Sequence, residues 1–103
     1  MEKYDKNYFK NTKMLEKYFY DSLVLFRFNT IEDITKRLNE DFKGVDLKVV
    51  GADFVTDYTN DYQDYELIVI MGNEEEEIID ISIYYAFSRI GEKIVTETSY
   101  EYV

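Results

Sequence analysis

Three pairs of adjacent aspartate and tyrosine are the residues best suited to chemistry in this 103-residue chain. They follow one another closely as Asp57–Tyr58, Asp61–Tyr62 and Asp64–Tyr65. A carboxylate pairs with an arginine or a lysine, and a neighbouring tyrosine ring offers the same cation its π face. The pairs are therefore typical of a surface that binds a basic protein. They fit equally well an ordinary polar turn, in which aspartates shape the backbone between two strands.

A run of four glutamates forms a second group of carboxylates: Glu74, Glu75, Glu76 and Glu77. Acids at alternate positions of a strand recur every ~6.7 Å, so two neighbouring strands approach the density of phosphates along one DNA strand. We expect Glu74 and Glu76 to share such a strand face, as do Glu75 and Glu77. Glu97 and Glu101 share a strand face at twice that interval. The run is either a solvated segment that protects the following strand from aggregation or part of an anionic binding face that imitates nucleic acid.

The acidic residues are concentrated in the second half of the chain. The whole chain holds 12 basic and 22 acidic residues, a formal net charge of −10. Residues 1–48 carry ten basic and nine acidic side chains, whereas residues 49–103 carry thirteen acidic ones and only Arg89 and Lys93 as basic ones. The acidic half would repel phosphates, so direct binding of nucleic acid is not expected. Solubility alone does not explain why the acids avoid the first half.

The composition excludes several kinds of catalytic and metal site. The chain has no cysteine and no histidine, so it offers no thiolate or imidazole ligand and no histidine base. Its four isolated glycines form no phosphate-binding loop, and residues 57–64 lack the glycine and the final glutamate of a calcium loop. We therefore expect no enzymatic activity, no cofactor and no metal.

The chain also lacks the signals of a membrane or secreted protein. No apolar stretch approaches the roughly 20 residues that a membrane-spanning helix needs. The first residues lack the apolar core of a signal peptide. These features predict a cytoplasmic protein without a membrane partner.

Hydrophobic spacing predicts a first helix from about residue 5. Winding the chain at about 100° per residue gathers apolar side chains on one face, namely Tyr4, Tyr8, Leu15, Tyr18 and Phe19. The opposite face carries a lysine stripe, Lys3, Lys6, Lys10, Lys13 and Lys17. We interpret the stripe as a solvated face; contact with a membrane surface, with phosphate or with the acidic half of a second copy is the alternative. Residues 23–28 fit either the end of this helix or a short strand, and the unbroken apolar face favours helix.

A second helix is predicted between two clear signals. Thr30 precedes Asp33 in the spacing of a capping box, and Gly44 provides a left-handed stop. Between them, Ile34 and Leu38 follow helical spacing.

After Gly44 the period of the apolar residues changes from 3.6 to about 2, which predicts strands. Gly51–Ala52 interrupts the first alternating segment as a bulge or a turn, and Tyr65–Met71 is apolar enough for a central strand. Gly72–Asn73 is typical of a two-residue hairpin turn. The last segment, 94–103, alternates strictly, with one face formed by Thr96, Thr98, Tyr100 and Tyr102.

The predicted fold is therefore α+β, with two N-terminal helices packed on an antiparallel sheet of three to five strands. We expect one domain over residues 1–103, with a helical part at about 5–43 and a sheet part at about 45–103.

In these features the chain resembles the small acidic inhibitors that phages and mobile elements carry, such as anti-CRISPR and anti-restriction proteins. The resemblance lies in the composition of the whole chain: about one hundred residues, strong acidity, no cysteine or histidine, Asp-Tyr pairs and a glutamate run. Many of those proteins are similar to DNA in charge and occupy the nucleic-acid groove of their target. The chain resembles nuclease immunity proteins less closely. The resemblance carries over no individual site residue.

Two hypotheses follow for the function. The first is a non-enzymatic inhibitor that binds a basic nucleic-acid-handling protein through Asp57, Tyr58, Asp61, Tyr62, Asp64 and the glutamates 74–77. The second is a structural module that forms a homodimer by pairing its tyrosine-rich last strand with that of a second copy.

Overall fold

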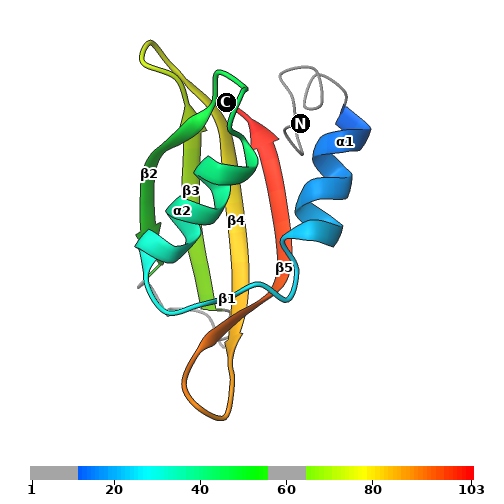
Figure 1. Ribbon diagram of the computed structural model, residues 1–103, viewed down its shortest axis with the longest axis vertical. Helices are drawn as coiled ribbons and strands as arrows, with labels where there is room; N and C mark the ends of the chain where they lie inside the picture. Colours follow the sequence, from blue (N-terminus) through cyan, green and yellow to red (C-terminus); the bar gives the residue numbers. More distant parts are fainter. Residues whose placement is uncertain (1–11, 56–64) are drawn as a thin grey trace.

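The computed structural model describes residues 12–55 and 65–103 as helical segments on one side of a five-stranded sheet (Figure 1). The helical segments are α1 (Thr12–Lys17), the π-helical turns η2 (Tyr18–Ser22) that continue it, and α2 (Ile31–Asp41). The strands are β1 (Arg27–Phe28), β2 (Lys48–Phe54), β3 (Tyr65–Gly72), β4 (Glu77–Phe87) and β5 (Lys93–Tyr102). They are antiparallel throughout, in the order β1-β5-β4-β3-β2.

The predicted α+β class and antiparallel sheet are confirmed, but the order of the elements is only partly as expected. One helical segment lies near the N-terminus, whereas α2 follows β1 in the chain. Phe28 of β1 pairs with Lys93 of β5, so a strand from the helical half forms one edge of the sheet. The helices therefore do not form a separate N-terminal layer.

The inner face of the sheet is apolar because strand residues alternate between the two faces. Leu67, Val69 and Met71 of β3 lie opposite Ile83, Ile81 and Ile79 of β4, and all six are buried. The helical segments cover this face with their own buried residues, Leu15, Tyr18, Phe19, Ile34 and Leu38. Figure 1 shows α2 crossing in front of the sheet and α1 running beside β5.

A hydrogen-bonded network joins the two helical segments. The Tyr18 hydroxyl donates to Asp41 Oδ2 at 2.6 Å, and Arg37 Nε donates to the same oxygen at 2.6 Å. Arg37 also donates to the carbonyl of Ser22 at 3.1 Å. Burial lowers the pKa of Arg37, but the hydrogen bond and charge of Asp41 outweigh it, and the pKa is raised. One carboxylate of α2 therefore fixes the position of η2.

The predicted second helix is confirmed, from its N-cap at Thr30 to the left-handed Gly44 that follows its end. Asp33 N donates to Thr30 Oγ1, and the amides of Asn29 and Thr30 donate to Asp33 Oδ2 at 2.8 and 3.1 Å. These two backbone amides, Asn29 foremost, lower the pKa of Asp33. Gly44 has a φ of 94°, in the left-handed region that glycine adopts without strain.

The prediction that helix continues through residues 23–28 is wrong. Leu25 has a φ of 74°, and its amide donates to the Val95 carbonyl at 2.8 Å. The Val95 amide donates in turn to the Phe26 carbonyl at 3.0 Å. The segment therefore leaves the helix because the edge of β5 provides partners for its backbone groups.

The turn between β3 and β4 is longer than the two residues predicted. Gly72 pairs with Glu77, so residues 73–76 form the connection. Asn73 Oδ1 accepts hydrogen bonds from the amides of Glu75 and Glu76 at 2.9 and 3.0 Å. A Cβ at Gly72 would lie 2.2 Å from the Glu76 carbonyl oxygen, so only glycine fits there.

Two bulges determine which side chains face the core. The interruption at Gly51 is a bulge between Val49 and Gly51 inside a continuous β2. A second register shift lies in β5, where Glu97 pairs with Tyr84 but Val95 pairs with Tyr85. Val95 is therefore buried on the same face as Thr98, although strict alternation predicts the opposite face.

Removing the Tyr18 hydroxyl should destabilise the protein. We expect Tyr18→Phe to lower the free energy of unfolding by about 2 kcal/mol, because a hydrogen bond to a charged group is lost. Urea denaturation of both proteins measures the difference. Tyr20→Phe is the matched control, since Tyr20 is 49% exposed. Equal losses in the two variants would contradict a specific role for the Tyr18–Asp41 bond.

The cap of α2 should make stability depend on pH. The folded pKa of Asp33 lies below its ordinary value of 3.8. Its contribution is therefore complete above that value and is lost as the pH falls through the folded pKa. We expect Asp33→Asn to be less stable than the unmodified protein near neutral pH and to approach its stability in acid. A deficit of constant size across this range in urea denaturation would disprove the assignment.

Candidate protein-binding surface

The residues that the sequence singled out are not brought together as one site in the described structure. Asp57, Tyr58, Asp61, Tyr62 and Asp64 lie outside the described residues. The strand ends that flank them, Phe54 and Tyr65, lie at one end of the sheet. The glutamate run lies at the other end, and the eight residues of β3 between them span about 24 Å.

The glutamate run occupies a solvated hairpin. Glu74, Glu75, Glu76 and Glu77 are all exposed, and only Glu77 belongs to a strand. The expectation that Glu74 and Glu76 share one strand face is therefore wrong, because the backbone turns at these positions. The spacing of phosphates is not reproduced by this run.

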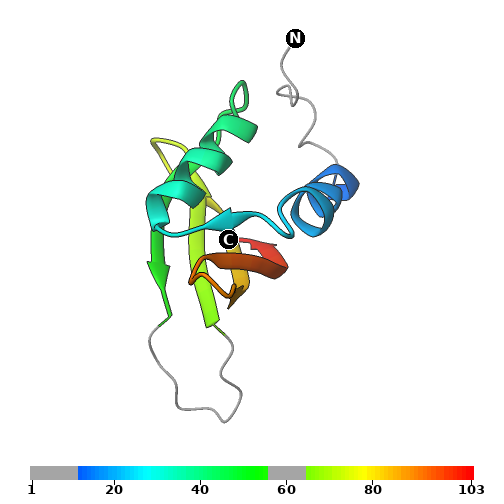
Figure 2. The ribbon, with the colours of Figure 1, turned by 60° about the horizontal axis from the view of Figure 1, so that its bottom comes forward.

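The face of the sheet opposite the helices is an acidic surface that the sequence analysis did not assemble. Figure 2 shows the helical segments on one side of the sheet, and no described helix or strand covers the other side. Cross-strand pairing gives the middle of this face three adjoining rows, bordered by one row with Lys48 beside Gly72 and another with Arg27 beside Ile94. The three rows are Gly51–Ile70–Asp80–Glu101, Asp53–Ile68–Ser82–Ser99 and Glu66–Tyr84–Glu97. We call these eleven residues the open face.

The open face carries five carboxylates and no basic side chain in its three rows: Asp53, Glu66, Asp80, Glu97 and Glu101. Apolar and aromatic groups lie between the acids, since Ile68 is 38% exposed and Tyr84 separates Glu66 from Glu97. Glu97 and Glu101 share this face, as the sequence predicts. Carboxylates interleaved with apolar side chains suit a protein partner that supplies cations.

Asp80 is the least favourable charge on this face. It lies directly opposite Glu101, and like charges in that position repel each other. Its Oδ1 atom is buried, and no group in the described part of the chain donates a hydrogen bond to it. Asp80 and Glu101 line an open depression of about 290 Å³, together with Ser82, Ser99 and Tyr100.

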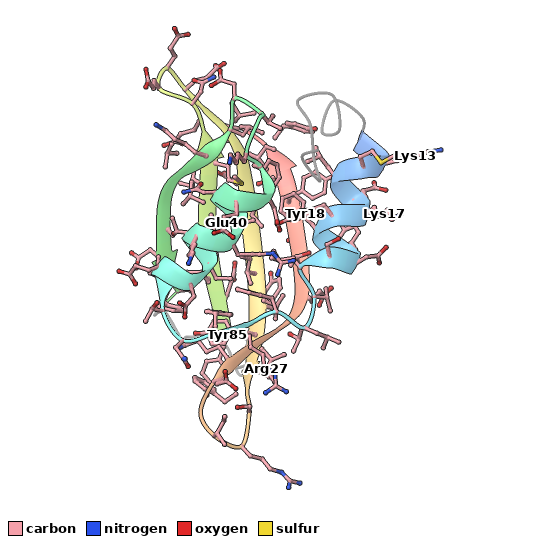
Figure 3. The ribbon with its side chains drawn as sticks, viewed as in Figure 1. Lys13, Lys17, Tyr18, Arg27, Glu40 and Tyr85 are labelled. Atoms are coloured by element: carbon pink, nitrogen blue, oxygen red, sulfur yellow. The ribbon has the colours of Figure 1, made fainter. Side chains whose placement is uncertain are left out.

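Arg27 and Lys48 border the open face, whereas other basic residues lie away from it. Lys93 Nζ donates to the Asn29 carbonyl at 2.8 Å and lies within 6 Å of the rings of Phe28, Phe54 and Phe87. Lys13 and Lys17 project from the outer side of α1, as Figure 3 shows. The three rows of the open face therefore hold no basic side chain, and basic and acidic side chains meet at its borders and on the helical side.

The tyrosine-rich side of the last strand packs inside the chain. Thr98 is buried, and its hydroxyl donates to the Phe19 carbonyl at 2.6 Å. The Tyr100 ring lies 5.1 Å from that of Phe19, and burial raises the pKa of Tyr100. β1 pairs with the beginning of β5. By contrast, Thr96 and Tyr102 of the same side are exposed. β1 pairs only with Lys93 and Ile94, so the rest of the β5 edge, on which the homodimer hypothesis depends, has no strand partner among the described residues.

Residues 12–55 and 65–103 contain no cluster of acidic side chains arranged to hold a metal ion. Within the same ranges, no helix is long and apolar enough to cross a membrane. No protein-family model, curated protein or solved structure matches the chain. The surface itself is therefore the feature from which a function can be inferred.

Part of the open face can be predicted from the sequence. Asp80, Ser82 and Tyr84 alternate with buried isoleucines, which places them on the solvent side of β4. The pairing of Asp80 with Glu101 depends on the register of β5 and is not visible in either segment alone.

Neutralising Asp80 should stabilise the free protein. We expect Asp80→Asn to raise the free energy of unfolding by about 1 kcal/mol, because it relieves the repulsion between the half-buried Asp80 carboxylate and Glu101. Thermal or urea denaturation measures the change. Glu75→Gln removes the same charge from the exposed hairpin and should change stability very little. A loss of stability in Asp80→Asn would show that Asp80 makes a favourable contact in the free protein.

Proposed function

We propose that this chain is a non-enzymatic acidic protein that binds a basic nucleic-acid-handling protein and blocks its nucleic-acid-binding surface. The observation that carries the proposal is the open face, with five carboxylates and no basic side chain in its rows. A cation-lined groove that accepts a phosphate backbone also attracts such a face.

The spacing of the open face supports charge mimicry. Residues two apart on one strand are ~6.7 Å apart, and neighbouring strands are ~4.8 Å apart. Glu97 and Glu101 on β5 are four residues, ~13 Å, apart, Asp80 on β4 lies one strand from Glu101, and Glu66 on β3 lies two strands, ~10 Å, from Glu97. The carboxylates are therefore separated by about 5 to 13 Å, which is the same order as the spacing of phosphates along DNA. The likeness lies in charge density, and the interleaved Ile68 and Tyr84 add contacts that nucleic acid does not offer.

A pair of charge-reversal variants tests the proposal. The tagged chain is used to capture proteins from lysates of candidate host cells in low and high salt, and the captured protein is then tested for nucleic-acid binding. We expect capture of a basic nucleic-acid-binding protein that salt weakens and that nucleic acid displaces. The variant E66K/E97K/E101K should lose capture, because it reverses the charge of the open face.

The matched control is E74K/E75K/E76K, which makes the same change of charge on the hairpin and should retain most of the capture. A further variant, D61K/D64K/E75K/E77K, tests the residues selected from the sequence. Undiminished capture by E66K/E97K/E101K would disprove a role for the open face. Capture that is insensitive to salt and to nucleic acid would disprove charge mimicry.

A further inference from the structure

Asp80 occupies a position on the open face where the chain itself leaves a carboxylate incompletely satisfied. Its Oδ1 atom is buried without a hydrogen bond from the described residues, and Glu101 lies directly opposite. A buried unpaired acceptor and two adjacent like charges each cost free energy in the isolated protein. A partner that brings a cation with several N–H donors would offset the repulsion between the two carboxylates.

The surroundings of Asp80 are polar and open to a side chain from outside. Asp80, Ser82, Ser99 and Glu101 line the depression of about 290 Å³. The two carboxylates and the two hydroxyls present several acceptors within one small area. A guanidinium group is planar and has five N–H donors, so it can bond two carboxylates together, whereas an ammonium group acts as a compact point charge.

A second position for a cation adjoins the first. Tyr84 lies between Glu66 and Glu97 in one row of the sheet. Tyr84 and Glu97 line another depression, of about 710 Å³, that also includes Ser99. The two depressions therefore share a lining residue, and a tyrosine flanked by glutamates offers both ion pairing and a π face.

We propose that the open face is an arginine-binding surface, in which an extended basic segment of the partner inserts one arginine at Asp80–Glu101 and a second cation beside Tyr84. This inference rests on the proposed function and specifies the chemistry of the partner. Charge complementarity selects a basic segment, and the Asp80–Glu101 pair selects arginine over lysine. Asp80 is thus unfavourable in the free protein and is neutralised by the partner.

Two peptides of equal length and charge, oligoarginine and oligolysine, test this surface without a natural target. Binding to the full chain is measured by titration calorimetry, and the contact is located by NMR amide shifts. We expect oligoarginine to bind about tenfold more tightly, since one additional charge-assisted hydrogen bond is worth that factor. The largest shifts should fall on β4 and β5 around Asp80 and Glu101.

Three variants separate a specific pocket from general attraction. Asp80→Asn should lower oligoarginine affinity about tenfold and remove most of the preference over oligolysine. Asp80→Glu keeps the charge but displaces the carboxylate, and it should also reduce the preference. Glu75→Gln is the control with the same loss of charge as Asp80→Asn and should bind as the unmodified chain does.

Two results would overturn the inference. Equal binding of the two peptides would remove the preference for arginine. Equal losses in Asp80→Asn and Glu75→Gln, or shifts centred on residues 74–77, would place the contact elsewhere. These outcomes are independent of lysate capture, because a target whose binding ignores Asp80 would leave the proposed function standing and only the arginine pocket disproved.

Discussion

Two short helical segments cover only one face of a five-stranded sheet, and this constraint decides the character of both faces. Each strand projects its side chains alternately, so the covered face must be apolar and the uncovered face must tolerate water. β4 shows the consequence within one strand: Ile79, Ile81 and Ile83 are buried, whereas Asp80, Ser82 and Tyr84 face outward. Five of the thirteen acidic residues in the second half of the chain thus lie on the side that the helices leave bare.

The arrangement of positive charge follows from the same constraint. The first half of the chain supplies the helices, and it also carries most of the lysines. Arg27 and Arg37, which form ion pairs with Glu92 and Asp41, belong to the same half. Lys93, which the acidic half contributes, is held by a carbonyl and three aromatic rings at the β1 end of the sheet. Opposite charges therefore pair within the helical side and at the ends of the sheet. Neither of these ion pairs neutralises a carboxylate in the three rows of the open face.

Local signals made part of this fold predictable. The capping box of Thr30 and Asp33 and the stop at Gly44 each involve residues close in sequence, so α2 was predicted nearly to its ends. The apolar run at 65–71 likewise identified a central strand. Residues 23–28 were not predictable in this way, since their apolar spacing fits a helix and the hydrogen bonds to Val95 decide the matter. The same distinction between local and long-range signals applies to the candidate surface. Glutamates 74–77 stand out as a run, whereas Asp80 and Glu101 become neighbours only through the register of β4 and β5.

The bulge in β5 exchanges the faces on which odd-numbered and even-numbered side chains lie. Before it, the odd-numbered Val95 faces the core; after it, the even-numbered Thr98 and Tyr100 do, and the odd-numbered Glu97 and Glu101 face outward. In a regular strand, burying Val95 would bury both glutamates as well. Deletion of Thr96 would therefore restore regular pairing and keep every side chain of β5 on its present face. Deletion of one residue later in the strand would move the side chains beyond it to the opposite face. A single-residue deletion in this strand therefore keeps both faces only at the bulge, and elsewhere the faces are kept only when two residues are removed together.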